Sequence, residues 1–179
     1  MPNWCENNLI VEGPPKAVRA FVECVKDGEN SELSFERLVP TPPASLDDEV
    51  ARELGRTSAG DPQQNNQPDW YHWRIKHWGT KWDANAVRVV EHQPDEGRIE
   101  YGFDTAWAPP ESWLRTVAEM FPTLRFTLRY VEETMDFAGV IVCRGAEAVE
   151  REVPVPDFTN EQRENGEGFW ATDIEIPDN

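Results

Sequence analysis

The spacing of apolar residues predicts two amphipathic helices in this chain. The first covers about residues 16–26, with prolines before it and Gly28 just after it. The second begins after Pro109-Pro110 and stops at Pro122. Their apolar positions recur at helical intervals: Val18, Phe21, Val22 and Val25 in the first, and Trp113, Leu114, Val117, Ala118 and Phe121 in the second.

Short apolar or alternating runs predict strands on either side of these helices. They cover residues 8–11, 34–39, 87–90, 99–103, 124–130 and 137–143. The segment Gln93-Pro94-Asp95-Glu96-Gly97 is typical of a hairpin turn. A further helix is expected from Trp70 to Trp78, with Asp69 as its cap and Gly79 at its end.

The order of these elements predicts an α+β fold. It is β-α-β, then a helical insertion, then β-β-α-β-β, which favours a ferredoxin-like, split βαβ antiparallel sheet with extra strands. We expect one domain over residues 1–146, with the insertion at about 40–82. Within the insertion, residues 46–54 are a helical candidate and residues 61–68 a polar loop.

Residues 147–179 form an acidic C-terminal extension with ten acidic and two basic residues. Its polar part has the composition of a disordered segment. It also contains aromatic and isoleucine side chains that can anchor parts of it to the domain: Phe158, Phe169, Trp170, Ile174 and Ile176. We expect an extension that is partly docked.

The negative net charge of the chain argues against some classes of binding partner. Among 179 residues, 34 are acidic and 17 basic, so the formal net charge at pH 7 is −17. Proteins that bind nucleic acid non-specifically, or anionic membranes, use clusters of lysine and arginine, which this chain lacks. We therefore expect no direct nucleic-acid binding and no membrane binding. The acidity fits a solubilising surface, a basic protein partner or imitation of a polyanion.

Cysteine usage and the N-terminal residues predict a cytoplasmic location. Cys5, Cys24 and Cys143 are odd in number and form no C-x-x-C motif, which is typical of reduced thiols. The first residues lack the basic and apolar regions of a signal peptide, and no apolar run approaches 18 residues.

No motif in the chain indicates catalysis, a metal or a cofactor. His72 and His77 are five residues apart, so they do not share a helix face as metal-binding pairs at i, i+4 do. Gly79-Thr80-Lys81 lacks the upstream glycines of a phosphate-binding loop. There is no G-x-S-x-G nucleophile motif. We expect no catalytic residue, no metal and no cofactor.

The distribution of tryptophan is the least ordinary feature of the sequence. Six of the eight tryptophans lie between residues 70 and 113. They can close a second core, or they can form a platform on which a base, a sugar or a peptide stacks beside Lys81. Asp83 and Asp104 stand in the same aromatic surroundings. Each is either a buried ion pair or loop cap, or a carboxylate whose pKa is raised by burial.

Three motifs resemble the YubB-type ferredoxin-like family of phage, prophage and conjugative-plasmid proteins. They are Met1-Pro2-Asn3-Trp4-Cys5 with Asn7, Trp78-Gly79-Thr80-Lys81-Trp82-Asp83-Ala84, and Phe103-Asp104-Thr105-Ala106-Trp107-Ala108-Pro109-Pro110. The chain departs from the family at His77, where asparagine is common, and at Ala108, where serine is common. The resemblance implies a ferredoxin-like fold and a mobile-element protein in the cytoplasm of a bacterial host. It implies no reaction, because the fold hosts many functions.

The three motifs can meet at one end of the predicted sheet. One lies at a strand entry, one before a strand, and one between a strand and a helix. We therefore take as candidate binding residues Asn3, Trp4, Trp78, Lys81, Trp82, Asp83, Asp104 and Trp107.

Three functions fit these observations. The first is a non-enzymatic mobile-element protein that binds a basic partner, such as an acidic inhibitor of a host nucleic-acid-handling or defence protein. The alternative is a protein or enzyme that binds a small ligand or nucleotide with a Trp/Lys/Asp cluster. The third is a structural component of a phage particle.

Overall fold

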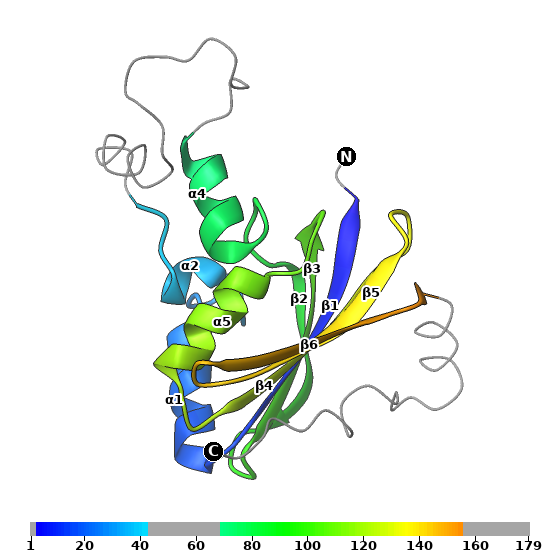
Figure 1. Ribbon diagram of the computed structural model, residues 1–179. Helices are drawn as coiled ribbons and strands as arrows, with labels where there is room; N and C mark the ends of the chain where they lie inside the picture. The colour runs from blue at the N-terminus through cyan, green and yellow to red at the C-terminus, as the bar shows by residue number, and fades with distance from the viewer. Residues whose placement is uncertain (1–2, 43–68, 156–179) are drawn as a thin grey trace.

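A six-stranded antiparallel sheet with helices on one face forms the framework of the chain (Figure 1). The computed structural model describes residues 3–42 and 69–155. The elements in chain order are β1 (Trp4–Glu12), α1 (Pro15–Val25), α2 (Phe35–Leu38), α4 (Asp69–Trp78), β2 (Asn85–Gln93), β3 (Arg98–Ala106), α5 (Glu111–Met120), β4 (Arg125–Glu132), β5 (Phe137–Arg144) and β6 (Glu147–Val153).

The order of strands across the sheet confirms the ferredoxin-like prediction. It runs β2-β3-β1-β4-β5-β6, with every neighbouring pair antiparallel. β3 separates β1 from β2, and β1 separates β3 from β4, which is the split βαβ arrangement. β5 and β6 extend the sheet beyond β4. The predicted turn at residues 93–97 joins β2 to β3.

The helix-facing side of the sheet carries the main core. Along β3, the buried side chains of Ile99, Tyr101 and Phe103 alternate with residues that point to the other face. The two amphipathic helices cover this side with apolar positions that their periodicity predicts. Buried on α1 and α5 are Val18, Phe21, Val25, Trp113, Leu114, Val117 and Ala118.

The strand predicted at residues 34–39 is wrong, because this segment forms the short helix α2. Its apolar pattern is too short to distinguish one helical turn from a strand by periodicity. Tertiary contacts decide between the two. The Phe35 ring packs against the rings of Trp78, Phe103 and Trp113, with centroid distances of 5.7, 5.8 and 4.7 Å.

Strand β6 is missing from the sequence prediction, in which β5 is the last strand. Residues 147–153 lie at the start of the acidic extension, where their charges obscure an alternation. Val149 packs against the fully buried Val140 and Val142 on the face opposite the helices. Successive side chains of a strand point to opposite faces, so Glu150, the residue after Val149, points to the helix side of the sheet.

Several sequence expectations fall on residues outside the described ranges. They concern the helical candidate at 46–54, the polar loop at 61–68 and residues 156–179 of the extension. Within the described ranges, no helix has the length and apolar character needed to cross a membrane.

The environments of the three cysteines lead to a testable difference in reactivity. Burial raises the pKa of Cys5 to about 12 and that of Cys143 to about 11, whereas Cys24 is exposed on α1. Because the thiolate is the nucleophile, we expect iodoacetamide at pH 8 to alkylate Cys24 at least about 100-fold faster than the other two. Mass spectrometry of the native chain should show one modification, and Cys24→Ser should show none. Rapid double alkylation of the native chain would contradict this assignment.

Candidate functional site

The loop between α4 and β2 is anchored to the end of β3. Gly79 ends α4 with a φ of +87°, a conformation that glycine adopts without strain. A side chain at this position would start 2.9 Å from the carbonyl oxygen of Pro109, so the two loops touch. The buried Thr80 hydroxyl then donates a hydrogen bond of 2.9 Å to the carbonyl of Ala106. The second and third motifs therefore meet.

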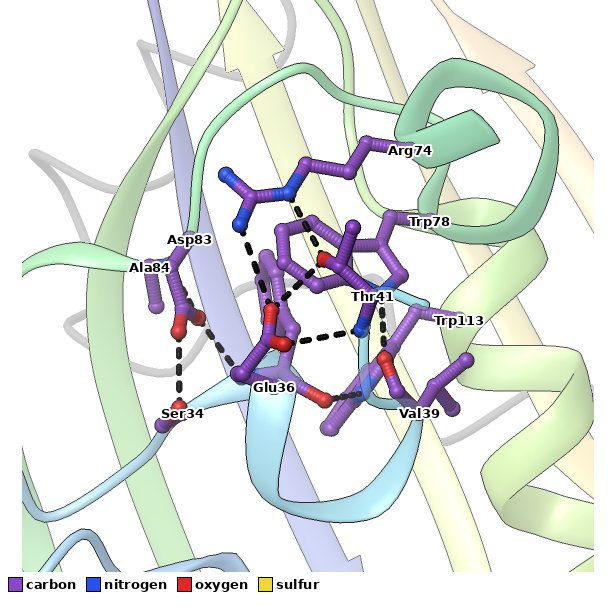
Figure 2. Close-up of polar contacts among 10 residues, drawn as sticks. Ser34, Glu36, Val39, Thr41, Arg74, Trp78, Asp83, Ala84 and Trp113 are labelled. Carbon is purple, nitrogen blue, oxygen red and sulfur yellow. Dashed lines mark hydrogen bonds and ion pairs between the residues drawn. The ribbon is translucent and has the colours of Figure 1, made fainter. Parts of the chain in front are cut away.

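Asp83 has a structural role in this loop (Figure 2). Its carboxylate accepts hydrogen bonds from the Ser34 hydroxyl at 2.7 Å and from the Phe35 amide at 2.6 Å. It also accepts the amide of Ala84 at 2.8 Å. Asp83 thus caps the first turn of α2 from a distant part of the chain. These contacts match the loop-cap alternative raised for Asp83, and they turn its carboxylate toward α2.

Trp78 is fully buried, and its indole N–H donates a hydrogen bond of 2.9 Å to the carbonyl of Val39. The Arg74 guanidinium lies 4.5 Å from the centroid of the Trp78 ring. Arg74 also donates to the Thr41 hydroxyl at 2.9 Å and pairs with Glu36 at 3.3 Å (Figure 2). Trp78 is therefore part of the core that joins α2 to α4.

Four of the candidate residues form an exposed tryptophan cluster, defined as Trp4, Lys81, Trp82 and Trp107. The Trp4 and Trp82 rings are 6.0 Å apart between centroids. The Lys81 ammonium lies 4.3 Å from the centroid of the Trp82 ring and 5.5 Å from that of Trp107. The exposed fractions of the three tryptophans are 37% for Trp4, 38% for Trp82 and 43% for Trp107.

Trp107 is held in the cluster by an unusual backbone conformation. Its φ is +75°, which is uncommon for a residue with a side chain and is kept only where the surroundings enforce it. The Trp107 amide donates to the carbonyl of Asn3 at 3.0 Å, which brings the first motif to the third. Two residues earlier, the buried Thr105 hydroxyl donates to the carbonyl of Ala108 at 2.8 Å. Asn7 donates to the same hydroxyl at 2.8 Å.

Asp104 lies on the sheet face opposite the helices. It is directly across from Glu6 in the pairing of β1 with β3, two positions from the Trp4–Ala106 pair. Burial raises the pKa of the Asp104 carboxyl, and the charge of Arg88 opposes this shift. Among the contacts of the described residues, none joins the Asp104 side chain to the tryptophan cluster.

A separate cavity of about 500 Å³ opens near the start of α5 and the strands β5 and β6, of which β6 is an edge of the sheet. No member of the tryptophan cluster lines it. Two of its residues, Glu150 and Glu152, belong to the strand that sequence reasoning missed. The signal available in the sequence is the alternation of Val149 and Val153 with charged residues, which places both glutamates on one face.

Comparisons with known proteins bear on the fold and the family. Among curated proteins, none matches the sequence. The chain is similar to the crystal structure of protein api92 from Yersinia pseudotuberculosis, with a TM-score of 0.50 and 11% identity, over 86% of this chain and 98% of the other. At this identity the likeness concerns the fold alone. The family model described as the ferredoxin-like domain in Api92-like protein matches residues 77–173, more than half of the chain. The chain therefore belongs to the Api92-like family with its ferredoxin-like domain.

Proposed function

We propose that this chain is a non-enzymatic interaction protein that binds a basic protein partner through the tryptophan cluster. One observation carries the proposal. Three tryptophans from separate parts of the chain, each more than a third exposed, are gathered at one end of the sheet, where Lys81 contacts two of them and the third contacts Trp82. Tryptophan is among the residue types that contribute most of the energy in protein interfaces.

The alternative interpretation, that tryptophans close a core, applies to tryptophans outside the cluster. Trp73, Trp78 and Trp113 are buried in the main core. Closing that core does not require Trp4, Trp82 and Trp107 at the surface, where more than a third of each residue is left in water. Because more than a third of each of these three residues is exposed to solvent, the cluster resembles a docking surface more than an enclosed pocket for a small ligand.

Charge supports a basic partner. The chain carries a net charge of −17, and Glu6 and Asp104 face one another on the strands that lead into the cluster. Arginine and lysine side chains stack on exposed indoles and pair with carboxylates. A strongly negative net charge also speeds association with basic partners and slows association with acidic ones.

The resemblance of the motifs to YubB-type proteins suggests a biological setting for this binding. In our proposal the chain comes from a phage, prophage or conjugative plasmid and acts in the cytoplasm of a bacterial host. Its partner is a host protein that handles nucleic acid or takes part in defence. Duplex DNA carries one charge per about 1.7 Å, so 17 charges correspond to about 30 Å of duplex. In our proposal, a chain with this net charge occupies the partner's DNA-binding channel.

Affinity capture tests the proposal. We would immobilise the full chain, pass a bacterial lysate over it at low and at high salt, and identify retained proteins by mass spectrometry. We expect one stoichiometric basic protein at low salt and its loss at high salt, because exposed charge pairs are screened. Failure to retain a basic protein, or retention that does not depend on salt, would contradict the proposal.

A further inference from the structure

The cavity at the edge of the sheet is lined largely by β5 and β6, the two strands outside the four-stranded ferredoxin-like unit, together with residues of β4 and of the start of α5. It lies between the N-terminal end of α5 and the helix side of β5 and β6. Its volume of about 500 Å³ is within the range of small-ligand sites. The lining residues include Glu111, Tyr130, Asp136, Phe137, Glu150 and Glu152.

A glycine makes room for the aromatic wall of this cavity. A side chain at Gly139 would start 2.5 Å from the Tyr130 hydroxyl oxygen, so only glycine allows the Tyr130 ring to cross β5. The hydroxyl donates a hydrogen bond of 3.0 Å to Glu150 on β6. Burial, followed by the charge of Glu150, raises the pKa of Tyr130, which keeps this donor protonated. The Phe137 ring lies 6.2 Å from the Tyr130 ring between centroids.

The charge of the lining is strongly negative. Its four carboxylates are those of Glu111, Asp136, Glu150 and Glu152. Arg115 lies 2.7 Å from Glu111 and 3.9 Å from Glu150, so it compensates part of this charge. Among the described residues, no ion pair involves Asp136 or Glu152. The cavity therefore combines two aromatic rings with carboxylates that lack a cationic partner in this part of the chain.

We propose that this cavity binds a guanidinium group. A guanidinium is a planar cation that stacks on aromatic rings, donates two parallel hydrogen bonds to a carboxylate and is weakly hydrated. The site is distinct from the tryptophan cluster, and the inference does not rest on the proposed function. The guanidinium can come from a free small molecule or from an arginine side chain of a protein.

Butylguanidinium and its neutral isostere butylurea provide a matched pair of probes. We would titrate each into the full chain and follow backbone amides by two-dimensional NMR. We expect butylguanidinium to shift the amides of Ala138, Glu152 and Val153 in a saturable way, with butylurea at least 10-fold weaker. Equal responses to the two probes, or shifts that avoid the cavity, would overturn the inference.

Variants separate this site from general attraction to an acidic protein. Glu152→Gln removes one lining charge at an exposed position. Asp136→Asn also removes one lining charge, and asparagine tolerates the φ of +58° found at this position. We expect each to weaken butylguanidinium binding 3- to 10-fold. Glu119→Gln, on the exposed side of α5, removes the same charge outside the cavity and should change binding less than 2-fold. If all three variants behave alike, the cavity is not the site.

A third probe distinguishes the two sources of the ligand. The peptide Gly-Arg-Gly presents the guanidinium as part of a protein chain. Binding at least as tight as that of butylguanidinium would support an arginine side chain as the ligand. Exclusion of the peptide, with butylguanidinium still bound, would assign the cavity to a free small molecule. If neither probe binds, the inference is overturned, whatever protein the tryptophan cluster captures.

Discussion

Replacing Asp83 with alanine is expected to lower the free energy of unfolding by about 3 kcal/mol, because it removes a charged acceptor of three hydrogen bonds. The Ser34 hydroxyl and the Phe35 amide would lose their partner at a largely buried site. For a domain of this size the melting temperature should fall by about 9 °C. Thermal and urea unfolding, followed by circular dichroism, measure this change.

An aspartate with a different environment provides the control for this experiment. Asp95 pairs with Arg19 at 2.7 Å, but its side chain is 84% exposed. Exposed ion pairs contribute little, so Asp95→Ala should cost less than about 1 kcal/mol. If the two variants are equally stable, Asp83 does not anchor α2. Asp83→Ala should also alter tryptophan fluorescence, because Lys81 and Trp82 lie on the same loop.

Gly97→Ala is expected to destabilise the chain by about 3 kcal/mol through strain at the β2–β3 hairpin. Gly97 has a φ of +83°, which costs a residue with a side chain about 1–2 kcal/mol. The new methyl group would overlap the carbonyl oxygen of Gly13. Forcing backbone apart adds about 1–3 kcal/mol, and it weakens the hydrogen bond of 3.0 Å from the Gly13 amide to the Gly97 carbonyl. Urea unfolding measures the loss.

Gly28→Ala separates the two contributions to this strain. Gly28 also has a positive φ, +55°, but a methyl group there would meet nothing within 4 Å. Only the conformational cost remains, and we expect about 1 kcal/mol. A Gly97→Ala variant no less stable than Gly28→Ala would show that the hairpin does not press against Gly13.

The amphipathic helices and the four strands of the split βαβ unit could be predicted because local periodicity dictates them. Phe21 and Trp113 face the core in the positions that helical spacing requires. The helix within residues 34–39 could not be predicted, because a single helical turn is too short to show a periodicity. The contact that stabilises it comes from Asp83, which is 48 residues after Phe35. Similarly, β6 forms by pairing with β5, and the charged residues of β6 obscure the alternation that would identify it as a strand.

The candidate site was predicted in part for the same reason. The motif positions at one end of the sheet correctly indicate that Trp4, Lys81, Trp82 and Trp107 meet. Which of these side chains face solvent depends on the backbone conformation of individual residues, which the sequence does not reveal. Trp107, which has a positive φ, leaves 43% of its surface exposed, whereas Trp78, only four residues before Trp82, is buried at the end of α4.

The affinity of the captured partner for two tryptophan variants tests the central claim, that the tryptophan cluster is the binding surface. Trp82→Ala removes the indole that contacts Trp4 and Lys81. Trp70→Ala removes one that is similarly exposed, 41% against 38%, but lies on α4 outside the cluster. By isothermal titration calorimetry, we predict at least a 30-fold weaker Kd for Trp82→Ala, the loss typical of an interface hot spot, and less than a 2-fold change for Trp70→Ala. Equal affinities for the two variants would contradict the account.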